Sequence, residues 1–76
     1  MFFPLDNLKF KTLTKYNEDG KITLIASYNN GIVDGTFKKF YENGILMEEG
    51  TYKMMKKVGL WKYYDEAGNL IKTEEN

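Results

Sequence analysis

Short runs of alternating apolar and polar residues follow one another along the whole chain, and most of them end in a polar stretch with a glycine. Strict alternation of this kind is typical of half-buried β-strands. We therefore expect six strands, at residues 8–17, 21–29, 34–42, 45–53, 58–65 and 69–75. The longest helix candidate, around residues 53–57, is too short to be stable alone. Because the links are short, sequential strands should pair antiparallel, which predicts an all-β, six-stranded meander.

The strand pattern repeats with a period of 24 residues, which separates Gly20, Gly44 and Gly68. The same period relates several other pairs, namely Gly35 with Gly59, Tyr28 with Tyr52, Lys38 with Lys62, and Phe37 with Trp61. A fixed period of this length indicates a repeat architecture, in which terminal copies are often atypical. We predict one repeat domain over residues 1–76, with a degenerate first copy at about 11–34, a second at 35–58 and a truncated third at 59–76.

Each repeat is expected to form a β-hairpin, because Glu-Asp-Gly, Glu-Asn-Gly and Glu-Ala-Gly separate its two strands. Glycine in the third position favours a three-residue loop with a type I turn and a G1 bulge, since glycine accepts a positive φ without a Cβ clash. This register pairs one aromatic with one aliphatic residue in every hairpin. The expected pairs are Tyr16 with Ile22, Phe40 with Leu46, Tyr41 with Ile45, Tyr64 with Leu70, and Lys38 with Glu48.

The repeat unit resembles the MORN-repeat family in its bacterial variant form, which has Gly-x-Trp-x-x-Tyr followed by a turn with Asn-Gly or Asp-Gly. Residues 59–64, Gly-Leu-Trp-Lys-Tyr-Tyr, fit this motif fully, and residues 35–40 fit it with Phe at both aromatic positions. The resemblance covers residues 11–74. It implies hairpins stacked side by side in a single-layer, twisted antiparallel sheet. It also implies protein–protein or membrane-associated scaffolding, an antitoxin role in some bacterial members, and no shared catalytic residues.

The links between the repeats differ from one another. Asn30-Gly31 is a common turn sequence, whereas the corresponding Met54-Met55 is unusual for a surface loop. One interpretation is that the two methionines cover an open end of a thin core. The other is that they form an adaptable contact surface, because methionine is flexible and polarizable.

Both faces of the predicted sheet carry apolar residues, and no helix is available to cover either. Three solutions are open: the sheet curls on itself, the N-terminal Met-Phe-Phe-Pro-Leu covers one face, or a second molecule does so. We expect the face of Tyr16, Phe40, Tyr64, Tyr28 and Tyr52 to be the core. The face of Phe37, Trp61 and Tyr63 is then free for a partner or a second copy, although a bulge would change this division.

Composition narrows the possible functions. The chain has 76 residues, no cysteine and no histidine, and its 11 basic residues balance 11 acidic ones. These absences remove thiolate sites and the commonest general base, so we predict no enzymatic activity, no metal and no cofactor. Zero net charge argues against nucleic-acid and membrane binding. The N-terminus lacks the basic region of a signal peptide, which predicts a cytoplasmic location.

The sequence therefore predicts a small protein-binding module, which we interpret as an antitoxin or phage-encoded inhibitor of a larger bacterial enzyme. The expected binding residues are Phe37, Lys39, Tyr41, Met54, Met55, Trp61, Lys62 and Tyr63. Polar substitution of Phe37, Trp61 or Tyr63 should remove activity and leave the fold intact. Two alternatives stay open: a self-assembling scaffold or homodimer, and a single-strand nucleic-acid binder that uses a stripe of lysines and aromatics.

Overall fold

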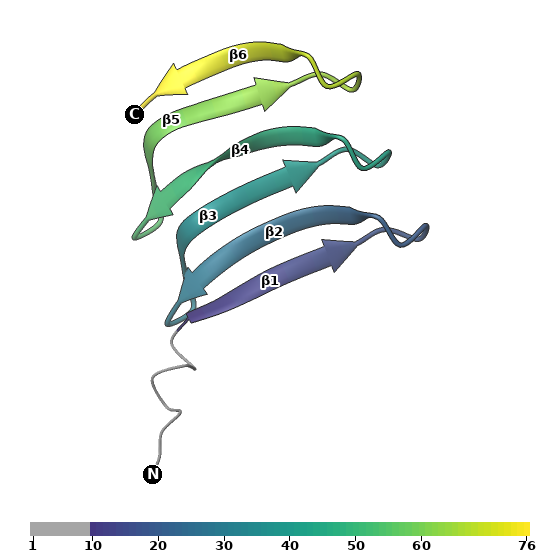
Figure 1. Ribbon diagram of the computed structural model, residues 1–76. Helices are drawn as coiled ribbons and strands as arrows, with labels where there is room; N and C mark the ends of the chain where they lie inside the picture. Colours follow the sequence, from purple (N-terminus) through teal and green to yellow (C-terminus); the bar gives the residue numbers. More distant parts are fainter. Residues whose placement is uncertain (1–9) are drawn as a thin grey trace.

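The computed structural model describes residues 10–76. They form one six-stranded antiparallel sheet in which every strand pairs with its neighbours in the sequence. The strands are β1 (Phe10–Tyr16), β2 (Ile22–Asn29), β3 (Ile32–Phe40), β4 (Leu46–Lys53), β5 (Lys56–Tyr64) and β6 (Leu70–Glu75). Figure 1 shows the three hairpins side by side in a single layer. The predicted all-β meander is confirmed.

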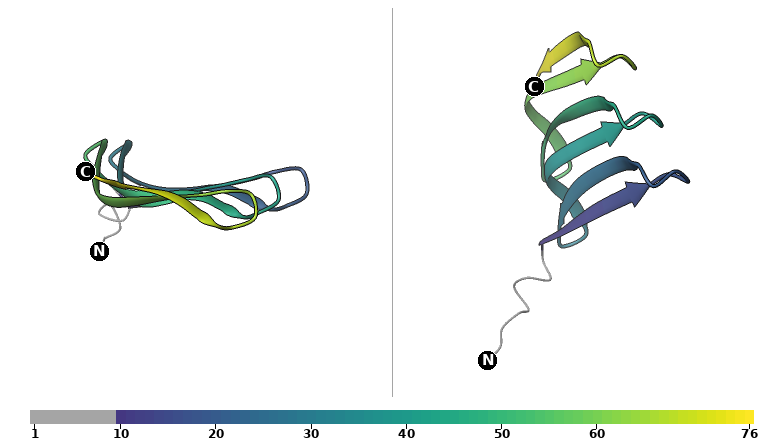
Figure 2. Two further views of the ribbon diagram at one scale, coloured as in Figure 1. Left: turned by 90° about the horizontal axis from the view of Figure 1, so that it is seen from above. Right: turned by 45° about the vertical axis from the view of Figure 1, so that its right-hand side comes forward.

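The molecule is a thin, elongated sheet with extents of 48 × 33 × 15 Å. Its radius of gyration is 14.3 Å, whereas a compact globule of this length has about 11 Å. One end of the sheet, where β2 turns into β3 and β4 into β5, curls out of the plane of the rest (Figure 2). No helix in residues 10–76 is long and apolar enough to cross a membrane. The suggested cover by the N-terminal segment lies outside the described residues.

Each hairpin loop has the predicted three-residue form. In the middle one, the Gly44 N–H donates to the Tyr41 carbonyl over 2.9 Å, and the Tyr41 N–H donates to the Ile45 carbonyl over 2.8 Å. The φ of Gly44 is 89°, which confirms the expected role of this glycine. The pairs of Tyr16 with Ile22, Phe40 with Leu46, and Tyr64 with Leu70 are also confirmed.

A bulge directly after each loop makes one predicted pair wrong. Lys38 pairs with Glu49 and Lys39 with Glu48, because Met47 is an extra residue between Leu46 and Glu48. Shifts at the equivalent places occur in the other two hairpins. A bulge inserts one residue into one strand only, so every later residue of that strand changes the face on which it lies.

The links between hairpins are shorter than predicted. β3 begins at Ile32 and β5 at Lys56, two residues earlier than expected, because two-residue turns suffice. Asn30 and Gly31 have φ of 58° and 82°, and Met54 and Met55 have φ of 52° and 73°. Two consecutive positive φ values define a type I′ turn, which matches the natural twist of the strands that it joins.

The first and third loops are closed by a carboxylate or amide side chain. Asp65 Oδ1 accepts hydrogen bonds from the backbone N–H groups of Ala67 and Asn69 at 3.0 and 2.9 Å. The Asn69 N–H is the main reason that the pKa of Asp65 lies below its ordinary value. Asn17 Oδ1 accepts the equivalent bonds from Asp19 and Lys21 at 2.9 and 3.0 Å.

The lowered pKa of Asp65 gives a testable pH dependence. Its stabilising contribution is present above the unfolded pKa of about 4 and is lost as the pH falls through the lower folded pKa. Asp65→Asn keeps the acceptor that Asn17 supplies in the first loop, so this variant should lose less stability on acidification than the wild type. Urea unfolding midpoints at neutral and acid pH measure the difference. Asp65→Ala, which removes the acceptor, should be less stable at every pH, and equal acid sensitivity of Asp65→Asn and wild type would contradict the assignment.

Candidate functional site

The core is a cluster of three aromatic side chains from β3, β4 and β5. The ring centroids of Phe37 and Trp61 are 5.7 Å apart, and Tyr52 meets them edge-on at 5.3 and 5.1 Å. Trp61 has no exposed surface, and its indole N–H donates to the Thr51 carbonyl over 3.2 Å. We call the side of the sheet that carries this cluster the Trp61 face.

The cluster is possible because small residues lie between the large ones. Leu13, Ala26, Phe37, Gly50, Trp61 and Glu74 form one cross-strand row. A Cβ atom built on Gly50 would overlap Cδ2 and Cε2 of Trp61, so the indole lies directly on the Gly50 backbone. Ala26, at the equivalent position 24 residues earlier, is 1% exposed and pairs with Phe37. The larger ring, Trp61, therefore lies on glycine, and the smaller ring, Phe37, lies beside alanine.

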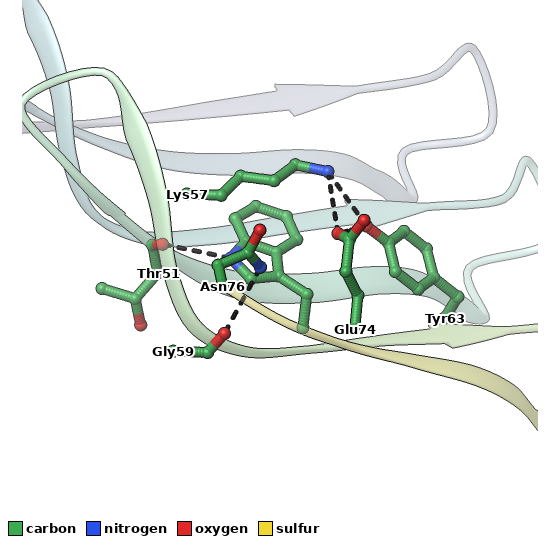
Figure 3. Close-up of polar contacts among 7 residues, drawn as sticks. Thr51, Lys57, Gly59, Tyr63, Glu74 and Asn76 are labelled. Atoms are coloured by element: carbon green, nitrogen blue, oxygen red, sulfur yellow. Dashed lines mark hydrogen bonds and ion pairs between the residues drawn. The ribbon is translucent and has the colours of Figure 1, made fainter.

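Lys57, from the curled end of β5, lies over the Trp61 indole and reaches Tyr63 and Glu74 (Figure 3). Lys57 Nζ lies 4.7 Å from the Trp61 ring centroid, donates to the Tyr63 hydroxyl over 2.9 Å and pairs with Glu74 Oε1 at 3.5 Å. The Tyr63 hydroxyl in turn donates to Glu74 Oε1 over 2.9 Å. The pKa of Lys57 is raised and that of Glu74 is lowered, and the largest cause of each shift is the hydrogen bond with Tyr63. The attraction between the two opposite charges contributes to both shifts. Both groups are thus held in their charged forms.

A groove of about 740 Å³ lies on the Trp61 face beside the cluster. Its apolar lining includes Leu24, Phe37, Tyr41 and Met47, and its polar lining includes Lys15, Lys39, Glu42, Asn43 and Glu66. Within residues 10–76, neither Lys15 nor Lys39 takes part in an ion pair. The groove therefore combines apolar area with two unpaired positive charges and with acidic groups from two loops.

Contacts between successive loops set the loop edge of the groove. The Asn17 amide donates to the Glu42 carbonyl over 2.8 Å, and the Asn43 amide donates to the Glu66 carbonyl over 3.2 Å. The Tyr41 hydroxyl donates to the Tyr64 carbonyl over 2.8 Å, which ties the second hairpin to the third. Because each loop is hydrogen-bonded to the next, the edge of the groove is held in place by the neighbouring hairpins.

The sequence profile described as MORN repeat variant matches residues 11–30, 33–54 and 57–75, which is most of the chain. The chain belongs to the MORN repeat variant family. No curated protein and no solved structure matches it. MORN repeats are non-catalytic binding modules that generally bind proteins.

The binding residues expected from the sequence do not form one surface on the three MORN repeats. Phe37, Lys39 and Tyr41 line the groove, and Tyr63 lies in the Lys57 network. Met54 and Met55 form an exposed turn. Lys62 lies on the opposite face, in the row of Thr14, Ile25, Lys38, Glu49, Lys62 and Thr73. The expected stripe of lysines and aromatics is therefore divided between two faces.

The expected position of the core is corrected. Tyr16 is 63% exposed, whereas Trp61 is fully buried, so the core lies on the Trp61 face. Tyr52 was expected to share a face with Tyr16, but it packs against Trp61. The bulge at Met47 is the reason, because it shifts the register of β4 by one residue. Polar substitution of Trp61 is consequently expected to unfold these MORN repeats, contrary to the expectation of an intact fold.

Sequence reasoning did not identify Gly50 or Glu74 as important. Gly50 had a detectable signal, because the repeat period places it and Ala26 at one position, opposite Trp61 and Phe37 respectively. Glu74 had none, since its contact with Lys57 depends on the curl of β5. Such curls arise where strands are irregular, and here Gly35 and Gly59 have positive φ values of 114° and 69°.

Proposed function

We propose that this MORN repeat module binds another protein through the groove on the Trp61 face, and that it inhibits a larger bacterial enzyme, as an antitoxin or a phage-encoded inhibitor in the cytoplasm. The groove is the observation that carries the proposal. It joins apolar side chains to Lys15 and Lys39, which have no ion-pair partner within residues 10–76. Apolar area with a charged rim is typical of protein interfaces.

The rigidity of the groove and the chemistry of its side chains support the inhibitor hypothesis. A rigid surface binds with little loss of conformational freedom, and the groove side chains lie on strands and on loops that are bonded to one another. The groove side chains include no histidine or cysteine, so the chemistry available there is recognition by shape and charge. Blocking the active site of an enzyme needs only such recognition.

A pair of neighbouring lysines provides the test. Lys39 lines the groove, whereas Lys38 lies on the opposite face. Each lysine has a cross-strand glutamate, Glu48 for Lys39 and Glu49 for Lys38, so the two are closely matched. We expect Lys39→Ala to weaken capture of the partner about tenfold, which corresponds to about 1.4 kcal/mol, and Lys38→Ala to leave it unchanged. The measurement is affinity purification from bacterial lysate with quantitative mass spectrometry, followed by titration of the captured enzyme.

Three results would contradict all or part of the proposal. Equal capture by both variants would place the binding surface outside the groove. Recovery of the bait alone, together with a mass that rises with concentration, would favour the self-assembling scaffold. If an enzyme is captured and keeps its activity at stoichiometric MORN protein, the binding function stands and the inhibitor function fails.

A further inference from the structure

The β4–β5 turn has a backbone conformation that its own residues disfavour. Met54 and Met55 have φ of 52° and 73°, in the left-handed region that L-residues with a Cβ atom rarely adopt. The β2–β3 turn has the same type I′ form with Asn30 and Gly31, which are the residues that this turn prefers. The chain thus contains a strained turn and its relaxed counterpart at equivalent positions of two repeats.

The side chains of the two methionines are largely exposed. Their exposed fractions are 63% and 64%, so neither side chain is part of the core. The Met55 N–H donates to the Val33 carbonyl over 3.0 Å, but any residue except proline would supply this donor. Strain of this kind persists only where function or surrounding structure requires it. The earlier interpretation that the methionines cover an open end of the core is not supported by this exposure.

The charge around the turn is positive. Lys53 and Lys56 flank the two methionines and are exposed, and neither takes part in an ion pair within residues 10–76. The next residue, Lys57, is already paired with Glu74 on the Trp61 face. The β4–β5 turn therefore exposes two flexible apolar side chains between two lysines that form no ion pair within residues 10–76.

We propose that Met54 and Met55 insert into an apolar pocket of a protein partner whose rim carries acidic side chains opposite Lys53 and Lys56. This inference rests on the proposed function, in that the partner is a protein, and it adds a contact outside the groove. Flexible, polarizable methionine adapts to a pocket, and opposite charges at the rim orient the two surfaces. The zero net charge of the chain makes an acidic protein surface a better match than an anionic lipid surface.

The experiment uses a phage-displayed library of random peptides, selected on the full-length wild-type protein. Selected peptides are then measured against Met54→Asn/Met55→Gly, which copies the sequence of the β2–β3 turn, and against Ile71→Thr, which changes an apolar residue of similar exposure, 62%. We expect peptides that combine a large apolar residue with Asp or Glu, and at least a tenfold loss of affinity for the double methionine variant alone. Lys56→Glu should weaken the same peptides, and Lys11→Glu should not.

Each other outcome overturns the inference in a distinct way. Peptides that bind the wild type and the turn variant equally leave the proposed protein-binding function standing and remove the turn from it. If no peptide is enriched, both the turn and the proposed function lose their support. Enriched peptides without acidic residues contradict the role of the lysines. Binding of vesicles of phosphatidylcholine and phosphatidylserine that the turn variant loses would assign the turn to lipid.

Discussion

Gly50→Ala is expected to remove most of the stability of the protein, although it adds only one methyl group. The new Cβ would occupy the space of the Trp61 indole, which has no exposed surface and packs against Phe37 and Tyr52. Overpacking of this kind costs about 1–3 kcal/mol, and we expect the upper end because a rigid ring is displaced from the backbone itself. The free energy of unfolding of a domain of this size is only about 3–5 kcal/mol. Urea unfolding and the emission of Trp61, the only tryptophan, measure the loss.

A second substitution should rescue this variant. Combined with Gly50→Ala, Trp61→Phe recreates the alanine–phenylalanine pair that Ala26 and Phe37 form one repeat earlier. Alone, Trp61→Phe should cost about 1–2 kcal/mol through lost apolar contact and the lost hydrogen bond to Thr51. The double variant G50A/W61F should be more stable than the sum of the single effects by about 1–3 kcal/mol. Simple additivity would show that the Gly50–Trp61 contact does not limit the size of residue 50.

Met54→Asn/Met55→Gly is expected to stabilise the protein. Left-handed backbone costs roughly 1–2 kcal/mol for an ordinary L-residue, whereas asparagine and glycine accept it more easily. Allowing for the greater chain entropy of glycine, we expect a net gain of about 1–2 kcal/mol. For a domain of this size, each kcal/mol raises Tm by about 4–8 °C. Differential scanning calorimetry of the two proteins measures the change.

The reverse exchange is the control. Asn30→Met/Gly31→Met places methionines in the relaxed turn and should lower Tm by a similar amount, since that turn has the same two positive φ values. If the methionine-to-asparagine/glycine exchange lowers Tm instead, side-chain contacts of Met54 and Met55 must outweigh the backbone strain. If Met54→Asn/Met55→Gly is more stable than the wild type and no longer binds the selected peptides, unfolding cannot be the cause of the lost binding. The result would then support both the backbone strain and the proposed contact site.

The local structure could be predicted because its signals are short in range. Loop glycines such as Gly44 require positive φ, and the aromatic–aliphatic pairs beside them set the register next to each loop. The period of 24 residues then determined the number of hairpins and their order. Phe37, Lys39 and Tyr41 were predicted as binding residues for a similar reason, since they alternate along the strand predicted at residues 34–42. All three line the groove.

The choice of the buried face could not be predicted in this way. One bulged residue, Met47, changes the face of everything that follows it in β4, and nothing in its identity marks it as bulged. Alternation therefore assigned Tyr52 to the wrong side and left Trp61 as an exposed binding residue. The Lys57–Tyr63–Glu74 network was equally hidden, because its members come from two strands and meet only through the curl of the sheet.

The sequence by itself determined the six strands, their antiparallel order, the loop type and the family, because these depend on local conformational preference and on a repeated motif. Tertiary structure alone decided which face is the core, where the groove lies and which lysines stay free of ion pairs within residues 10–76. These properties depend on how bulges and positive φ values add up across neighbouring strands. In a single-layer sheet, a shift of one residue is enough to exchange the inside and the outside.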